Sequence, residues 1–87
     1  MFASWGGETP HIYSEKELGG ILQELDTGKY GKILRAKGIV RCGEGWAEFD
    51  YVPEEYELRK AAPDYTGRLC VIGAELKEAE LVKLFTL

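Results

Sequence analysis

The chain has 87 residues, with 11 lysines and arginines against 15 aspartates and glutamates, and therefore a formal net charge of −4 at pH 7. This acidic balance argues against a protein that binds nucleic acid or an anionic membrane, because affinity for phosphates needs Lys and Arg concentrated on one surface. No run approaches the roughly 18 apolar residues of a membrane span, and the first residues lack the basic start of a signal peptide, so we expect one cytoplasmic domain over residues 1–87.

The clearest local signal is a helix that begins at a capping box, in which Ser14 is followed three residues later by Glu17. Apolar residues then recur at helical spacing at Leu18, Ile21, Leu22 and Leu25. Gly28 suits the left-handed position that ends a helix. Gly19 and Gly20 lie inside the helix and each costs about 1 kcal/mol relative to alanine. We therefore expect a sheet packed closely beneath both glycines.

A two-residue period then predicts a hairpin of two strands, residues 32–42 and 46–52, joined by a glycine-rich turn. On the first strand, one face carries Leu34, Ala36, Gly38, Val40 and Cys42, and the other carries Ile33, Arg35, Lys37, Ile39 and Arg41. On the second strand, one face carries Ala47, Phe49 and Tyr51, and the other carries Trp46, Glu48, Asp50 and Val52. If the basic face of one strand lies across from the acidic face of the other, each pair adds about 0.2–1 kcal/mol and the register is defined.

The remaining patterns predict an edge strand at residues 2–5, a weak strand at 56–61, an apolar central strand at 68–73 and a helix over 77–87. The apolar stripe of this last helix is Leu81, Val82, Leu84 and Phe85. Together the elements predict an α+β fold in the order β-α-β-β-β-β-α. We expect an antiparallel-rich sheet of four to five strands with two helices packed on one face.

Sequence motifs for nucleotide chemistry are absent from the chain. A phosphate-binding loop needs a glycine, four residues and then Gly-Lys-Ser/Thr, whereas Gly28-Lys29 has Gln23 at the first position and Tyr30 after the lysine. No Gly-x-Gly-x-x-Gly follows a strand, and no nucleophile, histidine and acid form a recognisable set. We therefore expect a protein that is not an enzyme and holds no cofactor.

Three residues are candidate metal ligands: Cys42, Cys70 and His11. They are widely separated, whereas structural zinc sites use four ligands, usually in close pairs. We expect reduced thiols that pack as small apolar side chains and an exposed histidine. A small stand-alone metal-binding protein that uses these three residues is the alternative function.

The basic strand face is the more informative surface. Arg35 and Lys37 could contact an acidic partner or a phosphate, or could pair with the acids of the hairpin. Trp46 shares their face and adds the mixture of apolar and charged groups found at protein interfaces. We predict that Arg35, Lys37 and Trp46 bind a partner protein, with Gly38 allowing its close approach.

Two segments, LRAKGIV at residues 34–40 and GRLCVIG at 67–73, resemble the C-terminal domain of the CobW family of P-loop GTPases. The hairpin, the leading helix and the leucine-bearing final helix are similar too, so the resemblance extends from about residue 2 to 85. It implies a domain that follows a GTPase domain in proteins of metal trafficking: cobalt insertion during cobalamin synthesis, zinc allocation or nitrile hydratase activation. The family's P-loop and its metal-binding Cys-x-Cys-Cys motif are both missing here. The resemblance therefore implies a non-catalytic interaction or regulatory module whose partner is a GTPase domain or a client metalloprotein.

Overall fold

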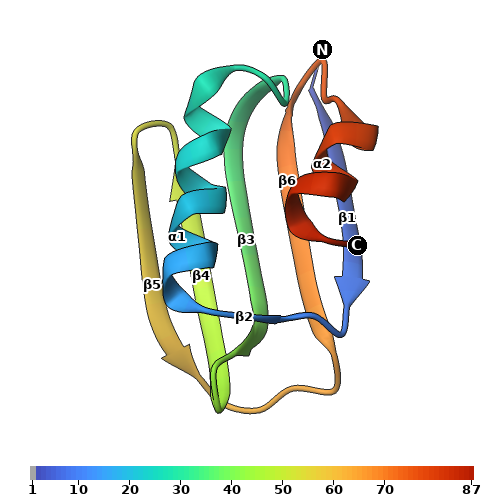
Figure 1. Ribbon diagram of the computed structural model, residues 1–87. Helices are drawn as coiled ribbons and strands as arrows, with labels where there is room; N and C mark the ends of the chain where they lie inside the picture. The colour runs from blue at the N-terminus through green and yellow to red at the C-terminus, as the bar shows by residue number, and fades with distance from the viewer. Residues whose placement is uncertain (1) are drawn as a thin grey trace.

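The computed structural model describes residues 2–87 and consists of one sheet with two helices on the same side (Figure 1). The strands are β1 (Ala3–Thr9), β2 (Ile12–Tyr13), β3 (Lys32–Cys42), β4 (Gly45–Val52), β5 (Glu55–Ala61) and β6 (Gly67–Ala74). The helices are α1 (Glu15–Glu24), the 3-10 turn Leu25–Thr27 and α2 (Glu78–Phe85).

The sheet has the strand order β1-β6-β3-β4-β5, and all of these neighbours are antiparallel. The two residues of β2 pair in parallel with the end of β3. The predicted α+β class, its element order and the placement of both helices on one face are confirmed. The sheet has six strands rather than four to five, because β2 adds a short pairing that no sequence period marks.

Helix α1 begins where the capping box predicts. The Ser14 hydroxyl accepts a hydrogen bond from the backbone N–H of Glu17 at 3.0 Å, and the Glu17 carboxylate accepts one from the N–H of Ser14 at 3.3 Å. The chain leaves the helix through the 3-10 turn and reverses at Gly28, whose φ of 82° is left-handed. The predicted start and end are therefore confirmed.

The two glycines inside α1 have different surroundings. A β-carbon on buried Gly19 would lie 3.1 Å from the hydroxyl of Tyr56 on β5, whereas one on exposed Gly20 would meet nothing within 4 Å. The predicted close packing against the sheet is confirmed at Gly19 and wrong at Gly20. The reason is helical geometry, since consecutive residues point about 100° apart around the axis.

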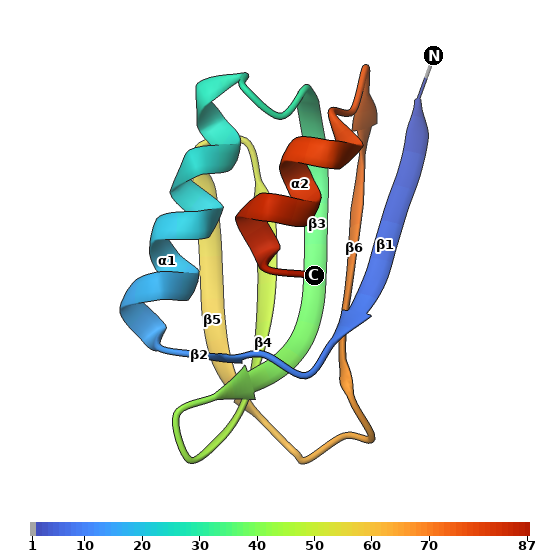
Figure 2. The same cartoon turned by 45° about the vertical axis from the view of Figure 1, so that its right-hand side comes forward.

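The core fills the space between the sheet and the helices. Helix α1 lies over the β4–β5 side and α2 over the β6–β1 side (Figures 1 and 2). The ring of Phe85 stacks against that of Phe49, with centroids 6.2 Å apart, and lies at the same distance from the indole of Trp5. The same core cluster contains fully buried side chains from the sheet and from both helices: Tyr13, Leu18, Leu22, Val40, Tyr51, Val71 and Leu81.

A β-bulge near the start of β3 changes which residues face this core. The register against β6 shifts between Ile33 and Arg35. Ile33 consequently points into the core and is buried, while Leu34 is only half-buried. The predicted alternation is wrong at these two residues, because a bulge inserts one extra residue and exchanges the faces that precede it. It holds from Arg35 onward.

The two ends of the chain are joined across the molecule. The Tyr13 hydroxyl donates a buried hydrogen bond to the carbonyl oxygen of Phe85, and that of Thr9 donates to the carbonyl of Thr86 at 3.4 Å.

Helix α2 is shorter than the predicted 77–87, and Lys77 provides no side-chain cap. Among residues 2–87 no helix has the length and apolar character needed to cross a membrane.

Candidate functional site

The sheet face that points away from α1 and α2 is covered by nothing in the described residues 2–87, and we call it the open face (Figure 2). Alternate side chains of a strand point to opposite faces, so the neighbours of the buried core residues lie here. In the order of the strands across the sheet, the residues of the open face are Ser4, Gly6 and Glu8 on β1; Arg68, Cys70 and Ile72 on β6; Arg35, Lys37, Ile39 and Arg41 on β3; Trp46, Glu48, Asp50 and Val52 on β4; and Glu55, Glu57 and Arg59 on β5.

Five charged residues of β3, β4 and β5 form a connected network on the open face, which we call the charge ladder: Arg35, Asp50, Arg59, Glu48 and Glu57. The carboxylate of Asp50 accepts from Arg35 at 3.1 Å and from Arg59 at 3.0 Å. Arg59 also lies 3.4 Å from the Glu48 carboxylate and 2.7 Å from that of Glu57.

The hydrogen bonds of the charge ladder shift the pKa values of two of its members. Hydrogen bonds from Arg59 and then Arg35 lower the pKa of Asp50, and the bond to Asp50 raises the pKa of Arg59. Exposed ion pairs contribute little to stability because water screens them and ordering the side chains costs entropy. The ladder therefore mainly orients side chains. The sequence offered two possible roles for Arg35, and the structure shows one of them, an ion pair with an acidic residue of the hairpin.

Lys37 differs from its basic neighbours on the open face. The register places it opposite Asp50, yet no ion pair to Lys37 is found within 4.0 Å among residues 2–87. Its side chain lies at a shallow hollow of about 410 Å³ that Ile39, Glu48, Arg68 and Cys70 also line. Lys37 is thus an exposed positive charge beside partly apolar surface.

Trp46 lies at the end of the open face where the β3–β4 hairpin turns. It is half-buried and stands directly opposite Arg41, whose guanidinium carbon is 6.0 Å from the indole centroid. A cation over an aromatic face is attracted by the ring's negative quadrupole. The Arg41 guanidinium therefore helps to orient the indole of Trp46.

Gly38 packs closely against the core. A β-carbon on Gly38 would lie 2.7 Å from a ring carbon of buried Phe49 and 2.6 Å from the carbonyl oxygen of Arg68. The close neighbour that requires glycine is therefore the core, on the helix side. Residue 38 points to the same face as Ala36 and Val40, which the helices cover, so this packing does not support a role for Gly38 in admitting a partner, and that role stays a prediction.

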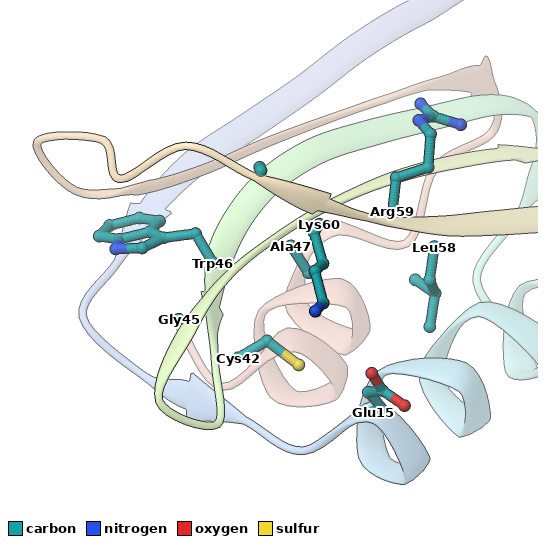
Figure 3. A pocket seen from close by; sticks show the side chains of 9 residues that line it. Glu15, Cys42, Gly45, Trp46, Ala47, Leu58, Arg59 and Lys60 are labelled. Atoms are coloured by element: carbon teal, nitrogen blue, oxygen red, sulfur yellow. The ribbon is translucent and has the colours of Figure 1, made fainter.

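A second hollow of about 410 Å³ lies on the helix side, between the start of α1 and the end of the β4–β5 hairpin (Figure 3). The side chains of Glu15, Cys42, Leu58 and Lys60 point into it, whereas that of Arg59 points away. Burial, followed by the negative charges of Glu15 and Glu17, raises the pKa of the Cys42 thiol. The thiol is therefore protonated at neutral pH and is a weak nucleophile and metal ligand.

The three candidate metal ligands do not come together. Cys42 points toward the helices, while Cys70 lies on the open face, so the sheet separates the two free thiols. His11 lies beside α1, with its Nε2 atom 3.0 Å from the carboxylate of Glu17. Within the described part of the chain no three His, Cys, Asp or Glu side chains are grouped so that they could hold a metal ion.

Sequence reasoning placed Arg35, Lys37 and Trp46 on one face, and the structure brings them onto the open face as expected. It missed Arg59, although the alternation of Glu57, Leu58 and Arg59 already carried a strand signal. It also missed that β6 lies beside β3 and adds the hollow next to Lys37, because no local pattern reports which strands become neighbours.

The comparisons with known proteins agree with this geometry. The family model of the cobalamin synthesis protein CobW C-terminal domain matches residues 2–86. The chain is similar to the crystal structure of the Zn(II)-bound YjiA GTPase from E. coli, with a TM-score of 0.80 and 22% sequence identity over 98% of this chain and 29% of that one. A Zn(II)-bound triple mutant of YjiA gives a TM-score of 0.81 at the same identity and coverage. The chain thus spans less than a third of the length of these GTPases. No significant match was found among curated protein sequences.

Proposed function

We propose, from the premise that this chain belongs to the family of CobW C-terminal domains, that it is a non-catalytic interaction module whose open face binds a GTPase domain. The structurally similar GTPases extend well beyond the region that this chain matches. The module positions or regulates the partner, which carries the nucleotide chemistry. We place this partnership in the cytoplasm, where the two free thiols stay reduced.

The observation that carries the proposal is the character of the open face. Hydrogen bonds connect the charge ladder, Arg41 helps to orient the indole of Trp46, and Lys37 is a free positive charge beside a hollow. Preorganised side chains lose little entropy when a partner binds, so their contacts convert more fully into affinity. Tryptophan and arginine are also the residue types that most often dominate binding energy at protein interfaces.

The metal-related part of the proposal concerns the partner. The two similar solved GTPase structures are Zn(II)-bound. We infer that the module serves a GTPase of the same kind that handles a metal ion for cobalamin synthesis or for another client pathway. The protonated Cys42 thiol and the separation of Cys42 from Cys70 favour a metal site on the partner over one on this chain. A client metalloprotein bound at the open face is the other outcome that the binding test can reveal.

The test is calorimetric titration of this chain with a CobW-type GTPase domain expressed without its own C-terminal domain. Trp46→Ala is expected to weaken binding about tenfold or more. Lys37→Gln is expected to weaken it by a smaller factor, while Lys16→Gln removes the same charge from an exposed position on α1 and should change nothing. Unaltered affinity in both open-face variants would contradict the proposal. Binding of a client metalloprotein with the same variant pattern, but none of the GTPase domain, would replace the proposed partner.

A further inference from the structure

The two edge strands of the sheet are protected to very different degrees. Each presents one row of backbone N–H and C=O groups that pairs with no other strand among residues 2–87. Strand β5 has charged side chains at Glu55, Glu57, Arg59 and Lys60, a common way to prevent edge-to-edge pairing. Strand β1 has the sequence Ala-Ser-Trp-Gly-Gly-Glu-Thr, in which Glu8 is the one charge and no proline or lysine occurs.

We propose that β1 pairs antiparallel with β1 of a second copy of this chain, so that the two sheets become continuous. The two-fold axis passes midway between Gly6 of one copy and Gly6 of the other. Gly6 is the midpoint of the strand Ala3–Thr9, so this register uses its whole length. It sets Trp5 opposite Gly7 of the second copy and Ser4 opposite Glu8 of the second copy. The pairing is compatible with antiparallel geometry. A residue whose backbone N–H and C=O point away from β6 lies opposite another residue whose N–H and C=O point away from β6, so the two can exchange hydrogen bonds.

The first argument for this register is the pairing of an aromatic side chain with a glycine. Trp5 is half-buried at the margin of the core, and Gly7 has no side chain with which to cover its part of the edge. An aromatic residue across from a strand glycine shields the exposed backbone and compensates for the missing side chain. Both lie on the helix side of β1, so the indole of each copy can lie beside the glycine of the other, next to the Leu87 side chain that already approaches Gly7.

A second argument is the apolar surface at the same edge. Leu87 is 38% exposed, and its side chain approaches Gly7 so closely that a β-carbon there would lie 3.1 Å from it. Phe2, which is 64% exposed, comes opposite Pro10 of the second copy if the pairing continues by one residue. A two-fold axis normal to the sheet keeps the helix sides of both copies together, so Trp5 and Leu87 of both copies meet at the junction.

The third argument is electrostatic. Like charges directly opposite one another in a sheet are destabilising. In this register the exposed Glu8 faces a serine, and it lies four residues along the strand from Glu8 of the second copy, a separation of about 13 Å. Because the contact uses the same strand on both copies, it closes at the dimer and does not propagate into a fibre. The dimer carries two open faces on one side.

Sedimentation equilibrium of the whole chain, at concentrations covering dissociation constants of about 1 µM to 1 mM, tests the proposal. Exposed Ser4 offers a matched pair of variants. Ser4→Lys places a positive charge opposite Glu8 of the second copy and should strengthen dimerisation, whereas Ser4→Glu should weaken it. With two such pairs per dimer, each change is expected to be about 2- to 30-fold.

The double variant Ser4→Glu/Glu8→Lys exchanges the two sides of the pair and should restore the dimer lost with Ser4→Glu alone. Within one copy these two residues are too far apart to pair, so restoration reports contact between copies. Circular dichroism checks that all variants keep the fold. A chain that is monomeric at every concentration, a mixture of higher oligomers, or equal effects of Ser4→Lys and Ser4→Glu would overturn the proposal.

Discussion

The two faces of the β3–β4 hairpin are built from alternate residues of the same strands and have opposite properties. Val40 and Phe49 are completely buried against the helices, whereas Lys37 and Asp50 lie on the open face. A single step along the backbone separates the two sets. We therefore expect the helix side to provide most of the stability of the fold, and substitutions on the open face to have little effect on it.

The largest expected effect tests the helix side. Phe49→Ala should lower the free energy of unfolding by about 3–5 kcal/mol, because it removes buried apolar surface and leaves a cavity beside Phe85. That is a large fraction of the roughly 5–15 kcal/mol available to a small domain. Denaturant unfolding measures it. Val52→Ala, on the open face of the same strand, should change the free energy of unfolding by no more than about 0.5 kcal/mol. A loss as large as that of Phe49→Ala would contradict the difference between the two faces.

Gly38→Ala tests the packing of the helix side at the centre of β3. We expect a loss of about 1–3 kcal/mol, since the added methyl group would overlap the Phe49 ring and a backbone oxygen. Gly45→Ala is the matched control, because a β-carbon there meets nothing within 4 Å. Thermal unfolding of both variants gives the answer. If Gly38→Ala kept its stability but lost partner binding, the result would support the predicted role of Gly38 in allowing a partner to approach closely.

A pH dependence follows from Asp26, which joins the end of α1 to the β4–β5 turn. It accepts a hydrogen bond from the Tyr51 hydroxyl at 2.5 Å and one from the N–H of Glu54 at 2.8 Å, and both lower its pKa. The resulting stabilisation is present above the ordinary aspartate pKa of about 3.9 and is lost as pH falls through the lower folded-state pKa.

Tyr51→Phe should therefore reduce the part of the acid-induced loss of stability that comes from Asp26, measured as unfolding free energy at pH 7 and below pH 4. Asp50 and Asp64 also have lowered pKa values, from their bonds to arginines, and they maintain the remaining slope in the variant. An identical pH profile in both proteins would show that the Tyr51–Asp26 bond does not contribute.

The smallest expected effect on stability belongs to the open face. Arg35→Glu/Lys37→Glu should change the unfolding free energy by less than about 1 kcal/mol, because both side chains are exposed. The same double variant should lose affinity for the GTPase domain. Unfolding of the domain, followed by circular dichroism, would show instead that the pairs on this face are structural.

Local patterns predicted most of the secondary structure. The capping box at Ser14 and the hairpin alternation depend on residues close in the chain, so they could be read directly. Strand β1 was predicted to end at residue 5 but extends to Thr9. Its glycines have little strand preference of their own, and pairing with β6, more than fifty residues later, keeps that segment extended.

The candidate site was predictable in part. Alternation put Arg35, Lys37 and Trp46 on one face, and their role in binding stays a prediction. It could not show that Arg59 connects three acids, that Arg35 is held by Asp50 while Lys37 is free, or that Gly38 accommodates Phe49. These facts depend on register and on the bulge at Ile33, and one extra residue in a strand reverses every face assignment on one side of it.

The fold class, the start of α1 and the two-sided character of the hairpin can be predicted from the amino-acid order, because they follow from periodicity and from interactions within a few residues. The contacts between distant segments settle which strands are neighbours, which face the helices cover and which edge strand carries only one charged side chain. Those outcomes depend on contacts between segments far apart in the chain. The burial of apolar surface drives such contacts, and because it is non-directional, the pattern of one segment does not specify which other segment it will pack against.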